Sequence, residues 1–418
     1  MCVSVCQQES KMENFFEFAI SPSLKEQLSG AGFVKPTPVQ AAAIPPGVQG
    51  KDVMATAQTG TGKTLAFLIP ILERLLQHSP CGVAALVLVP TRELAMQVAA
   101  QHDALRGKKL PPAALIVGGL SEYQQLETLR KGSRVVVATP GRLEDFLDRR
   151  LIQFNNLSVL VLDEADRMLD MGFRPAIRRI VSVLPKERQT LCFSATMEGD
   201  TARLIKDYTK NPVCLTFGST LKPSENVRLQ AFEAAAGSKA ETLRRLLKSE
   251  TGQCLVFART KRGSEKIASL LNREGINAAL IHGDRSQSQR TAALSGFRNG
   301  RYRVLVATDL ASRGIHVENI AHVINYDLPE IAENFIHRVG RTGRAGSRGT
   351  ASTLFLREQR SELFELERQL GIRLERMQSD GLPGEDVGRM LKEIPPSQPR
   401  RKPSIVQLPG EVLQLQMS

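Results

Sequence analysis

A glycine-rich segment, residues 57–64, stands between a β-branched apolar run and an apolar helix pattern, and it ends in Lys63 and Thr64. In this context glycines let backbone N–H groups turn inward onto phosphate oxygens, and the start of the helix adds partial positive charge. Lys63 is then placed to reach the β and γ phosphates of a nucleoside triphosphate, and Thr64 to ligate Mg²⁺. Ala57 stands where such a loop normally opens with glycine, and taken alone the loop also fits another class of nucleotide-binding protein. The residues expected to contact the nucleotide here are Thr59, Gly60, Thr61, Gly62, Lys63 and Thr64.

Further along the chain, the apolar run 159–162 leads directly into Asp163-Glu164-Ala165-Asp166. A carboxylate at the end of a buried strand is where an acid that holds Mg²⁺ belongs in a phosphate-loop NTPase, so Asp163 is the candidate metal ligand. Glu164, the next residue, is placed to orient or deprotonate the attacking water. An acidic helix N-cap is the alternative interpretation. Because a buried strand leads directly into three acidic residues, the catalytic interpretation is favoured over the helix N-cap.

The elements that must position these residues alternate regularly along the chain. Short β-branched apolar runs are each followed by a helical pattern, which is typical of a parallel sheet built from βα units. This alternation of strands and helices stops at residues 218–226, which are rich in linker residue types, and then begins again. The predicted strands include residues 52–56, 85–89, 134–138, 159–162 and 190–193 before the break, and 254–257, 278–281, 304–307 and 322–325 after it.

The length of 418 residues and the renewed alternation predict an α/β protein of two tandem domains. Each domain is expected to be a mainly parallel β-sheet flanked by helices. The C-terminal end is expected to be a short flexible tail, because it holds several prolines and glycines and a basic run at residues 399–403. A solvated end without function is the alternative for that tail. The expected boundaries are an N-terminal extension (1–14), a first domain (15–218), a linker (219–228), a second domain (229–380) and a mobile basic tail (381–418).

The net charge of +13 and the pI of about 9.7 suit a polyanionic partner, because Lys and Arg release condensed counterions from phosphates. The excess of basic residues is +4 in residues 1–218 and +9 in the remainder. Charge alone is weak evidence, since many basic proteins bind no nucleic acid. With no Trp and 4 Tyr, the chain is poorly suited to recognise bases on an aromatic stacking platform.

The composition also argues against several other classes of protein. Six cysteines are scattered without a C-x-x-C pair, which disfavours zinc and redox sites. No apolar stretch is long enough to span a membrane, and the N-terminus has no basic region followed by an apolar core, as a secretion signal would. We therefore expect a cytoplasmic protein without a membrane partner.

The four residues 163–166 spell the name of the DEAD-box ATP-dependent RNA helicases, and the chain resembles that family in ordered motifs across residues 15–346. The resemblance implies two RecA-like domains. It implies that Gln40 reads adenine, with Phe15 at the upstream aromatic position, and that Ser194 and Thr196 couple ATP hydrolysis to strand separation. The residues that it implies for RNA binding are Pro90, Thr91, Arg92, Gly119, Thr139, Gly141, Arg142, Arg259, Thr260, His282, Gly283, Gln287, Arg290 and Thr308.

Residues 337–344 resemble the arginine-finger motif of the same family. The phosphate loop of the first domain lacks a cation for the transferring γ-phosphate, and Arg341 and Arg344 could supply one across a cleft. Arg338 fits a structural salt bridge as well as a catalytic role. His337 is interpreted as an interdomain hydrogen-bond partner involved in coupling, without an acid–base role.

The chain departs from the family pattern after Gly314, where His316 occupies the position of an aspartate. The resemblance implies that this position contacts the ATP ribose. A neutral imidazole has one acceptor, whereas a carboxylate can accept from two ribose hydroxyls. We therefore expect weaker closure on ATP here, unless other groups compensate. A tolerated surface histidine is the alternative.

Together these features predict an ATP-dependent RNA helicase that uses ATP and Mg²⁺ and unwinds short RNA duplexes. Its RNA contacts are expected to be mainly sequence-independent. The resemblance to the short bacterial members implies a monomer that acts with ribosomal or mRNA-decay assemblies. Two alternatives remain at this point: a DNA helicase or translocase of the same superfamily, and an RNP clamp that holds RNA without unwinding it.

Overall fold

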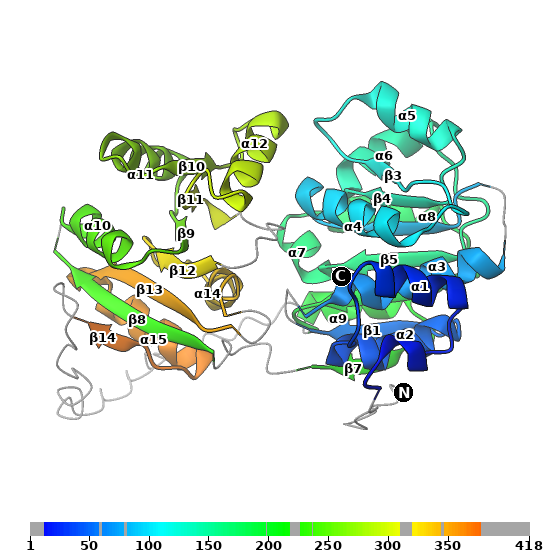
Figure 1. Cartoon of the computed structure of the whole chain (residues 1–418), viewed down its shortest axis with the longest axis horizontal. Helices are drawn as coiled ribbons and strands as arrows, with labels where there is room; N and C mark the ends of the chain where they lie inside the picture. Colours follow the sequence, from blue (N-terminus) through cyan, green and yellow to red (C-terminus); the bar gives the residue numbers. More distant parts are fainter. Residues whose placement is uncertain are drawn as a thin grey trace, which may run out of the picture.

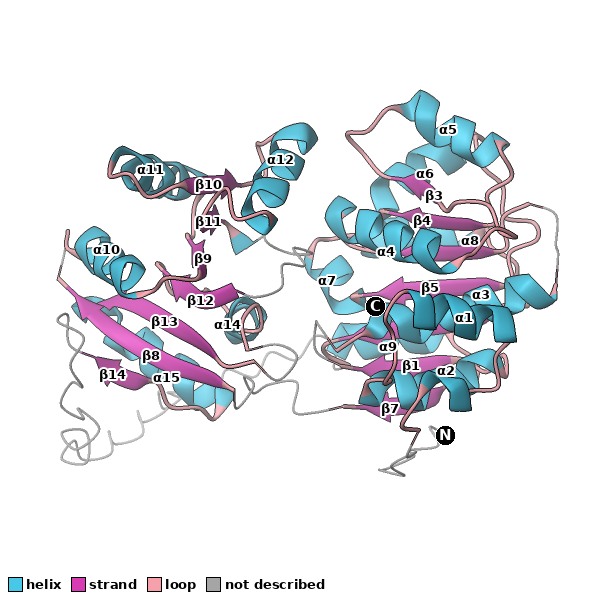
Figure 2. Ribbon diagram, viewed as in Figure 1, coloured by secondary structure: helices cyan, strands magenta, loops and turns pink. Residues whose placement is uncertain are grey.

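The computed structural model describes residues 12–57, 61–78, 82–197, 199–217, 226–235, 237–309, 320–343 and 347–377. The described chain forms two α/β units side by side, each with a twisted sheet at its centre (Figures 1 and 2). The sheet orders are β3-β4-β2-β5-β6-β1-β7 and β10-β11-β9-β12-β13-β8-β14, and all of the pairings are parallel. The predicted fold class, two tandem parallel-sheet domains flanked by helices, is confirmed.

The first unit comprises η1 (Phe15–Glu17), α1 (Pro22–Gly30), α2 (Pro38–Val48), β1 (Val53–Thr56), α3 (Lys63–Gln77), β2 (Ala85–Leu88), α4 (Arg92–Leu105), β3 (Ala114–Ile116), α5 (Glu122–Arg130), β4 (Val135–Ala138), α6 (Pro140–Asp148), β5 (Val159–Asp163), α7 (Ala165–Asp170), α8 (Arg174–Ser182), β6 (Gln189–Ser194), α9 (Gly199–Tyr208) and β7 (Val213–Thr216).

The second unit comprises β8 (Val227–Ala234), α10 (Lys239–Ser249), β9 (Gln253–Phe257), α11 (Lys261–Arg273), β10 (Ala278–Ile281), α12 (Gln287–Arg298), β11 (Val304–Ala307), β12 (Ile320–Asn325), α14 (Ala332–Val339), β13 (Gly349–Leu356), η2 (Arg357–Gln359), α15 (Arg360–Leu370) and β14 (Glu375–Met377). Strand β8 begins inside the expected linker, so residues 227 and 228 belong to the second sheet. The expected tail, 381–418, lies outside the described residues.

The predicted central strands are observed because parallel strands covered on both faces must be apolar along their whole length. Strands β2, β4 and β5 are buried at every position. Each sheet separates two apolar clusters, one under the helices of each face. This rigid core fixes the positions of the loops that leave the carboxyl ends of the strands.

Three of these carboxyl ends carry the residues singled out from the sequence. Strand β1 leads into the glycine-rich loop, β5 into the acidic run, and β6 into Ser194-Ala195-Thr196. These strands are neighbours in the order β5-β6-β1. Ligands of open parallel α/β sheets bind beyond the carboxyl ends of the strands. The fold therefore brings the three segments together at one edge of the first sheet.

The second sheet contains a buried histidine, which should make the stability of the second unit depend on pH. His322 on β12 is hydrogen-bonded through Nε2 to Ser352 Oγ at 2.8 Å, and burial lowers its pKa to about 4. The ordinary histidine pKa is about 6.5, so the unfolded chain binds more protons between these two values, and stability falls as the pH drops through that window. We expect this histidine to lower the free energy of unfolding by about 2 kcal/mol between pH 8 and pH 5.

The measurement is urea unfolding at both pH values, followed by a signal from the second unit, for the native chain and for His322→Gln. Glutamine keeps a donor for Ser352 but does not titrate, so the variant should lose this part of the pH dependence. Identical pH dependence in the two proteins would contradict the assignment.

Candidate nucleotide site and RNA-facing surface

Lys63 is held at the first turn of α3 by the geometry of the loop before it. Gly62, the N-cap residue, has a φ of +89°, a left-handed conformation that favours glycine. A Cβ atom at this position would also collide with the amide of Gln40. The buried Lys63 donates from Nζ to the carbonyl oxygen of Ala57 at 2.9 Å. The ammonium group therefore lies inside the loop, where a phosphate oxygen could replace the carbonyl as its acceptor. Thr59 and Gly60 lie outside the described residues.

Asp163 and Glu164 are both buried at the carboxyl end of β5, yet their environments differ. Burial raises the pKa of Asp163 to about 7, although nearby Lys63 opposes this shift. Its Oδ1 accepts a hydrogen bond from the backbone N–H of Glu164 at 3.0 Å. A buried carboxylate with so few donors around it fits a divalent cation.

Glu164 is surrounded by cations. Burial alone would raise its pKa, but Arg167, Lys63 and Arg341 hold the pKa of Glu164 down at about 2. The closest cation is the buried guanidinium of Arg167, which donates from Nη1 to Oε2 at 2.6 Å. Glu164 also has a φ of +52°, a left-handed backbone that is uncommon for a residue with a side chain. Sequence reasoning missed Arg167, although its place one turn after Glu164 on the same helix was a usable signal.

Asp166 connects the acidic run to the segment after β6. Its Oδ2 accepts hydrogen bonds from the backbone N–H groups of Ala195 and Thr196, both at 3.0 Å, and from Thr196 Oγ1 at 3.3 Å. Its own backbone N–H donates to Ser194 Oγ at 3.2 Å. A displacement of either loop must therefore move the other. This geometry suits the coupling role predicted for Ser194 and Thr196, which stays a prediction.

Gln40 touches the phosphate loop directly. Its Nε2 donates to the carbonyl oxygen of Gly62 at 2.9 Å, and its Oε1 accepts from the backbone N–H of Thr37 at 2.8 Å. Its predicted contact with adenine therefore has to use the remaining N–H and lone pair. Phe15, at the upstream aromatic position, stays a predicted nucleotide contact. Its ring is 2% exposed and packs beside Phe18, with centroids 5.7 Å apart, so in this structure it is part of the core.

The buried Arg341 approaches this site from the second unit. It contributes to the electrostatic environment of Glu164, and its Nε donates to the carbonyl oxygen of His337 at 3.3 Å. The two units therefore already bring a guanidinium towards the acidic run. Arg344, Gly314 and His316 lie outside the described residues.

Arg338, which the sequence left open, is a structural residue in this arrangement. Its buried guanidinium donates to both carboxylate oxygens of Asp309, at 2.5 and 2.7 Å. It also donates to Asn325 Oδ1 at 3.3 Å and to the carbonyl oxygen of Asp327 at 2.7 Å. All of these acceptors lie in the second unit, so Arg338 connects Asp309 to the end of β12 through hydrogen bonds.

The residues predicted to bind RNA separate into three groups. Arg259, Gly283 and Thr308 come together around a pocket of about 300 Å³ at the carboxyl end of the second sheet, together with Lys261. These positions can accept a nucleic acid backbone. In the first unit, Gly119, Pro90, Thr139 and Gly141 remain predicted RNA contacts on loops or helix starts at the carboxyl ends of their strands.

The second group uses its polar atoms within the protein. The hydroxyls of Thr91 and Thr260 cap helices α4 and α11 by accepting from the backbone N–H groups of Leu94 and Gly263, at 3.3 and 3.0 Å. Arg142 is ion-paired with Glu122 at 2.9 Å and Asp145 at 2.6 Å. His282 is buried against Glu265, with Nε2 at 3.1 Å from Oε1. RNA binding through Arg142 and His282 would require these side chains to exchange partners, whereas each threonine hydroxyl can still donate its own hydrogen.

Gln287 and Arg290 on α12 contact the first unit. The buried carboxylate of Glu93 accepts from Gln287 Nε2 at 3.1 Å and lies 3.0 Å from Arg290 Nη2. Arg92 Nη1 also donates to Gln287 Oε1 at 3.5 Å, and its guanidinium covers Gly119. These predicted RNA-binding residues thus hold the two units together in the described conformation. The role of Glu93 in this contact was not predicted from the sequence.

We expect Glu93→Ala to separate the two units, because removing one partner of a buried ion pair costs about 3 kcal/mol. Small-angle X-ray scattering of the ligand-free protein should show a larger radius of gyration. Glu127→Ala is the matched control, since Glu127 pairs with Lys131 on the surface of α5. An unchanged radius for Glu93→Ala would show that this contact does not hold the units.

The described residues also bear on metal sites and membrane spans. No group of three or more His, Cys, Asp or Glu side chains in that part of the chain could hold a metal ion by itself. A magnesium ion would accordingly need ligands from phosphate and water beside Asp163 and Thr64, as is usual for this ion. No helix among the described residues is both long and apolar enough to cross a membrane.

Comparisons with known proteins agree with this geometry. The family model described as DEAD/DEAH box helicase matches residues 37–205, and the helicase conserved C-terminal domain matches residues 238–346. The chain is 40% identical to the DEAD-box ATP-dependent RNA helicase CshA of Bacillus subtilis, over 88% of this chain and 74% of that protein. It is 41% identical to the ATP-dependent RNA helicase RhlB of Pseudomonas syringae, over 87% of this chain and 94% of that protein.

A similar solved structure is that of S. cerevisiae Dbp5 bound to RNA and ADP BeF3. Its TM-score is 0.79 and its identity 29%, with 88% of this chain and 96% of that chain covered. The two matched family models together span more than half of the chain. With its phosphate loop, its Asp163-Glu164-Ala165-Asp166 run and its two parallel-sheet domains, this chain belongs to the DEAD-box family of ATP-dependent RNA helicases.

Proposed function

We propose specific roles for the residues at the edge of the first sheet in this ATP-dependent RNA helicase. The observation that carries the proposal is the convergence of Lys63, Asp163 and Glu164 at the carboxyl ends of β1 and β5, which flank β6, with Arg341 contributing charge from the other unit. Lys63 binds the β and γ phosphates. Thr64 and Asp163 would hold Mg²⁺, which neutralises phosphate charge when bound. Glu164 orients the attacking water and accepts its proton.

Closure of the two units would complete this site. Arg341 and Arg344 stabilise the charge that develops on the transferring phosphoryl group, as arginine fingers do. The Asp166 link to Thr196 passes the movement of the acidic run to the segment that follows β6. The nucleotide base lies against Gln40, and Gly314 and His316 face the ribose. His337 lies at the boundary between the units.

RNA is proposed to lie across the carboxyl ends of both sheets. Arg259, Gly283 and Thr308 would contact its backbone in the second unit. The excess of basic residues supports contacts to phosphates, which carry little sequence information. Glu93 would release Gln287 and Arg290 as RNA enters. We further propose that the protein acts as a cytoplasmic monomer on ribosomal or mRNA-decay assemblies.

The experiment that tests the catalytic assignment is Glu164→Gln. The amide is nearly isosteric with the carboxylate but cannot take a proton from water, so hydrolysis should fall by about 10²–10⁴. ATP and RNA binding should persist, and the closed complex should accumulate on a labelled RNA strand.

Glu187→Gln is a suitable control, because Glu187 is an exposed acid paired with Lys210 on the surface. Loss of ATP binding in Glu164→Gln would instead assign Glu164 to the fold or to the metal. RNA-stimulated hydrolysis without release of a short duplex, in the native protein, would favour the RNP clamp over unwinding. Stronger stimulation by DNA than by RNA would favour a DNA translocase.

A further inference from the structure

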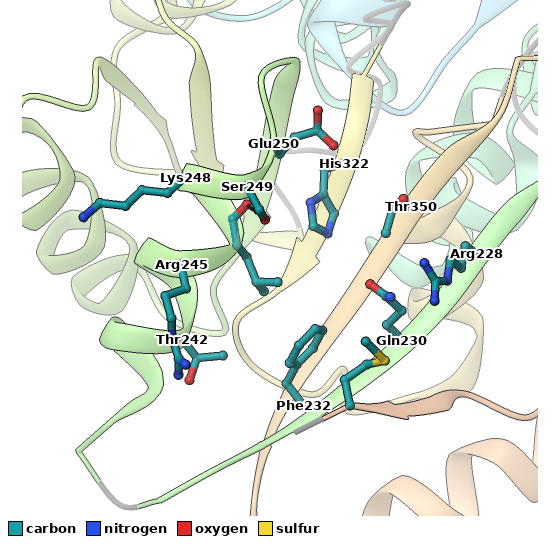
Figure 3. A pocket seen from close by; sticks show the side chains of 12 residues that line it. Arg228, Gln230, Phe232, Thr242, Arg245, Lys248, Ser249, Glu250, His322 and Thr350 are labelled. Carbon is teal, nitrogen blue, oxygen red and sulfur yellow. Dashed lines mark hydrogen bonds between the residues drawn. The ribbon is translucent and has the colours of Figure 1, made fainter. Parts of the chain in front are cut away.

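Three neighbouring strands of the second sheet change from apolar to polar residues along the face covered by α10. Phe232 on β8 lies opposite Leu354 on β13 towards the carboxyl ends. Nearer the amino ends, Gln230 lies opposite Ser352, and Thr350 lies opposite His322 on β12. Apolar packing against α10 therefore stops part of the way along the strands. The polar half forms the floor of a cavity of about 610 Å³ between α10 and the sheet (Figure 3).

The floor of this cavity presents one acceptor and one donor. Ser352 Oγ donates to Gln230 Oε1 at 3.3 Å, so at 2.8 Å it accepts from Nε2–H of the buried His322. The neutral ring then carries its lone pair on Nδ1. Neither this Nδ1 nor the amide nitrogen of Gln230 has a hydrogen-bond partner among the described residues, and both side chains line the cavity. A peptide group, with its N–H and C=O, complements such a pair.

The rim of the cavity carries little net charge, which limits the ligand. Arg245 and Lys248 extend from α10 and have no ion-pair partner in the described part of the chain. Arg228 is already neutralised, because its Nε and Nη2 both donate to Glu375 at 2.8 Å. Glu250 adds one negative charge to the rim. The single net positive charge that remains matches one carboxylate better than a terminal phosphate group, which carries nearly two negative charges.

A purely structural origin explains this arrangement less well. Apolar side chains at these strand positions would have continued the core, whereas the polar ones line the cavity with a donor and an acceptor. The walls also keep an apolar part, contributed by Phe232, Leu246 and Met377. The volume lies within the usual range of ligand sites, about 300–1,000 Å³. A mixed lining with a few convergent polar groups is typical of such sites.

We propose that this cavity binds an extended segment of a partner protein that carries one acidic side chain beside an apolar one. The backbone of the segment would pair with His322 and Gln230, its carboxylate with Arg245 and Lys248, and its apolar side chain with Phe232 and Met377. The cavity lies at the amino ends of the strands, whereas Arg259 and Thr308 follow their carboxyl ends. A partner bound here leaves the ATP and RNA sites open.

The test uses the full chain with ¹³C-methyl-labelled methionine, because Met377 lines the cavity and reports on its contents. The probes are two blocked peptides, acetyl-Ala-Leu-Glu-Leu-Ala-amide and its glutamine counterpart. The Met377 signal, assigned with Met377→Leu, should shift with the glutamate peptide. The affinity of the protein for the glutamine peptide should be about tenfold lower, which corresponds to 1.4 kcal/mol.

Two surface variants make the test specific. Arg245→Glu combined with Lys248→Glu should abolish the shift, and RNA-stimulated ATPase should remain within about twofold of the native rate. Lys266→Glu reverses an exposed charge on α11, away from the cavity, and should leave the shift intact. Unchanged signals from the other methionines would confirm that the variants fold.

Four outcomes would overturn the proposal. The first is no Met377 shift with either peptide at about 5 mM, a concentration that would detect even millimolar affinity. The second is equal affinity for the two peptides, which would remove the role of the carboxylate. The third is a shift with uridine monophosphate but not with the peptides, which would make the site one for nucleotides. The fourth is a response only after deletion of residues 381–418, which would make the chain's own end the occupant.

Discussion

Lys63→Ala will reduce ATP turnover to background, by at least about 10³-fold, because it removes the ammonium group that meets the β and γ phosphates. In the ligand-free structure this group is satisfied by the carbonyl oxygen of Ala57, so it is already positioned and loses little conformational freedom when a phosphate arrives. Its burial strengthens the interaction, since a charge pair is worth more away from water. The measurement is steady-state ATP hydrolysis at saturating RNA.

Lys51→Ala is the matched control, because Lys51 is an exposed lysine just before the strand that leads into the same loop. It should retain the native rate. The thermal midpoint of Lys63→Ala must also be measured, since the substitution leaves the Ala57 carbonyl without its donor. A stable, folded Lys63→Ala protein that still hydrolyses ATP at a near-native rate would show that the phosphates bind elsewhere.

Arg341→Ala will lower kcat by about 10³-fold or more, whereas ATP affinity will change much less. A guanidinium that reaches the phosphoryl group from the second unit acts mainly on the transition state. Arg341 is buried and already affects the charge of Glu164, which places it near the acidic run before any ligand is bound. Single-turnover hydrolysis and equilibrium binding of a labelled ATP analogue separate the two effects.

Arg341→Lys should not restore the rate, because an ammonium group cannot reproduce the planar fork of donors. Arg348→Ala, an exposed arginine a few residues further on, should behave like the native protein. Arg344→Ala must be measured beside them. If Arg341→Ala keeps the native kcat and Arg344→Ala loses it, the finger is Arg344 alone.

The local structure around the predicted site was predicted correctly where one short segment contains a strand, a loop and a helix in succession. A β-branched run before a glycine-rich loop and a helix pattern after it specify where Lys63 must lie, because strand, loop and helix are consecutive. The acidic run after β5 is predicted for the same reason. The central strands were readable because burial on both faces leaves them uniformly apolar.

Other strands were not predicted from the sequence, because their residues do not form a regular apolar pattern. Strands β8 and β13 are long and pair with each other, but Gln230 and Ser352 interrupt their apolar pattern on one face. The structure shows why, since Gln230 lines the cavity beside His322 and the buried Ser352 hydrogen-bonds to both side chains. Strand β3 has only three residues, too few for a periodic signal.

The sequence by itself determined the family, the two parallel-sheet domains and the positions of the phosphate loop and the acidic run. Only the tertiary structure decided which partner each charged or aromatic side chain has. Arg167 pairs with Glu164, Arg338 fastens Asp309, and Glu93 holds Arg290 across the two units. Phe15 packs beside Phe18 in the core of the first unit. The physical reason is that the residue type alone does not specify which groups a guanidinium or a ring will contact. Those groups come from segments far apart in the chain, which only the tertiary structure brings together.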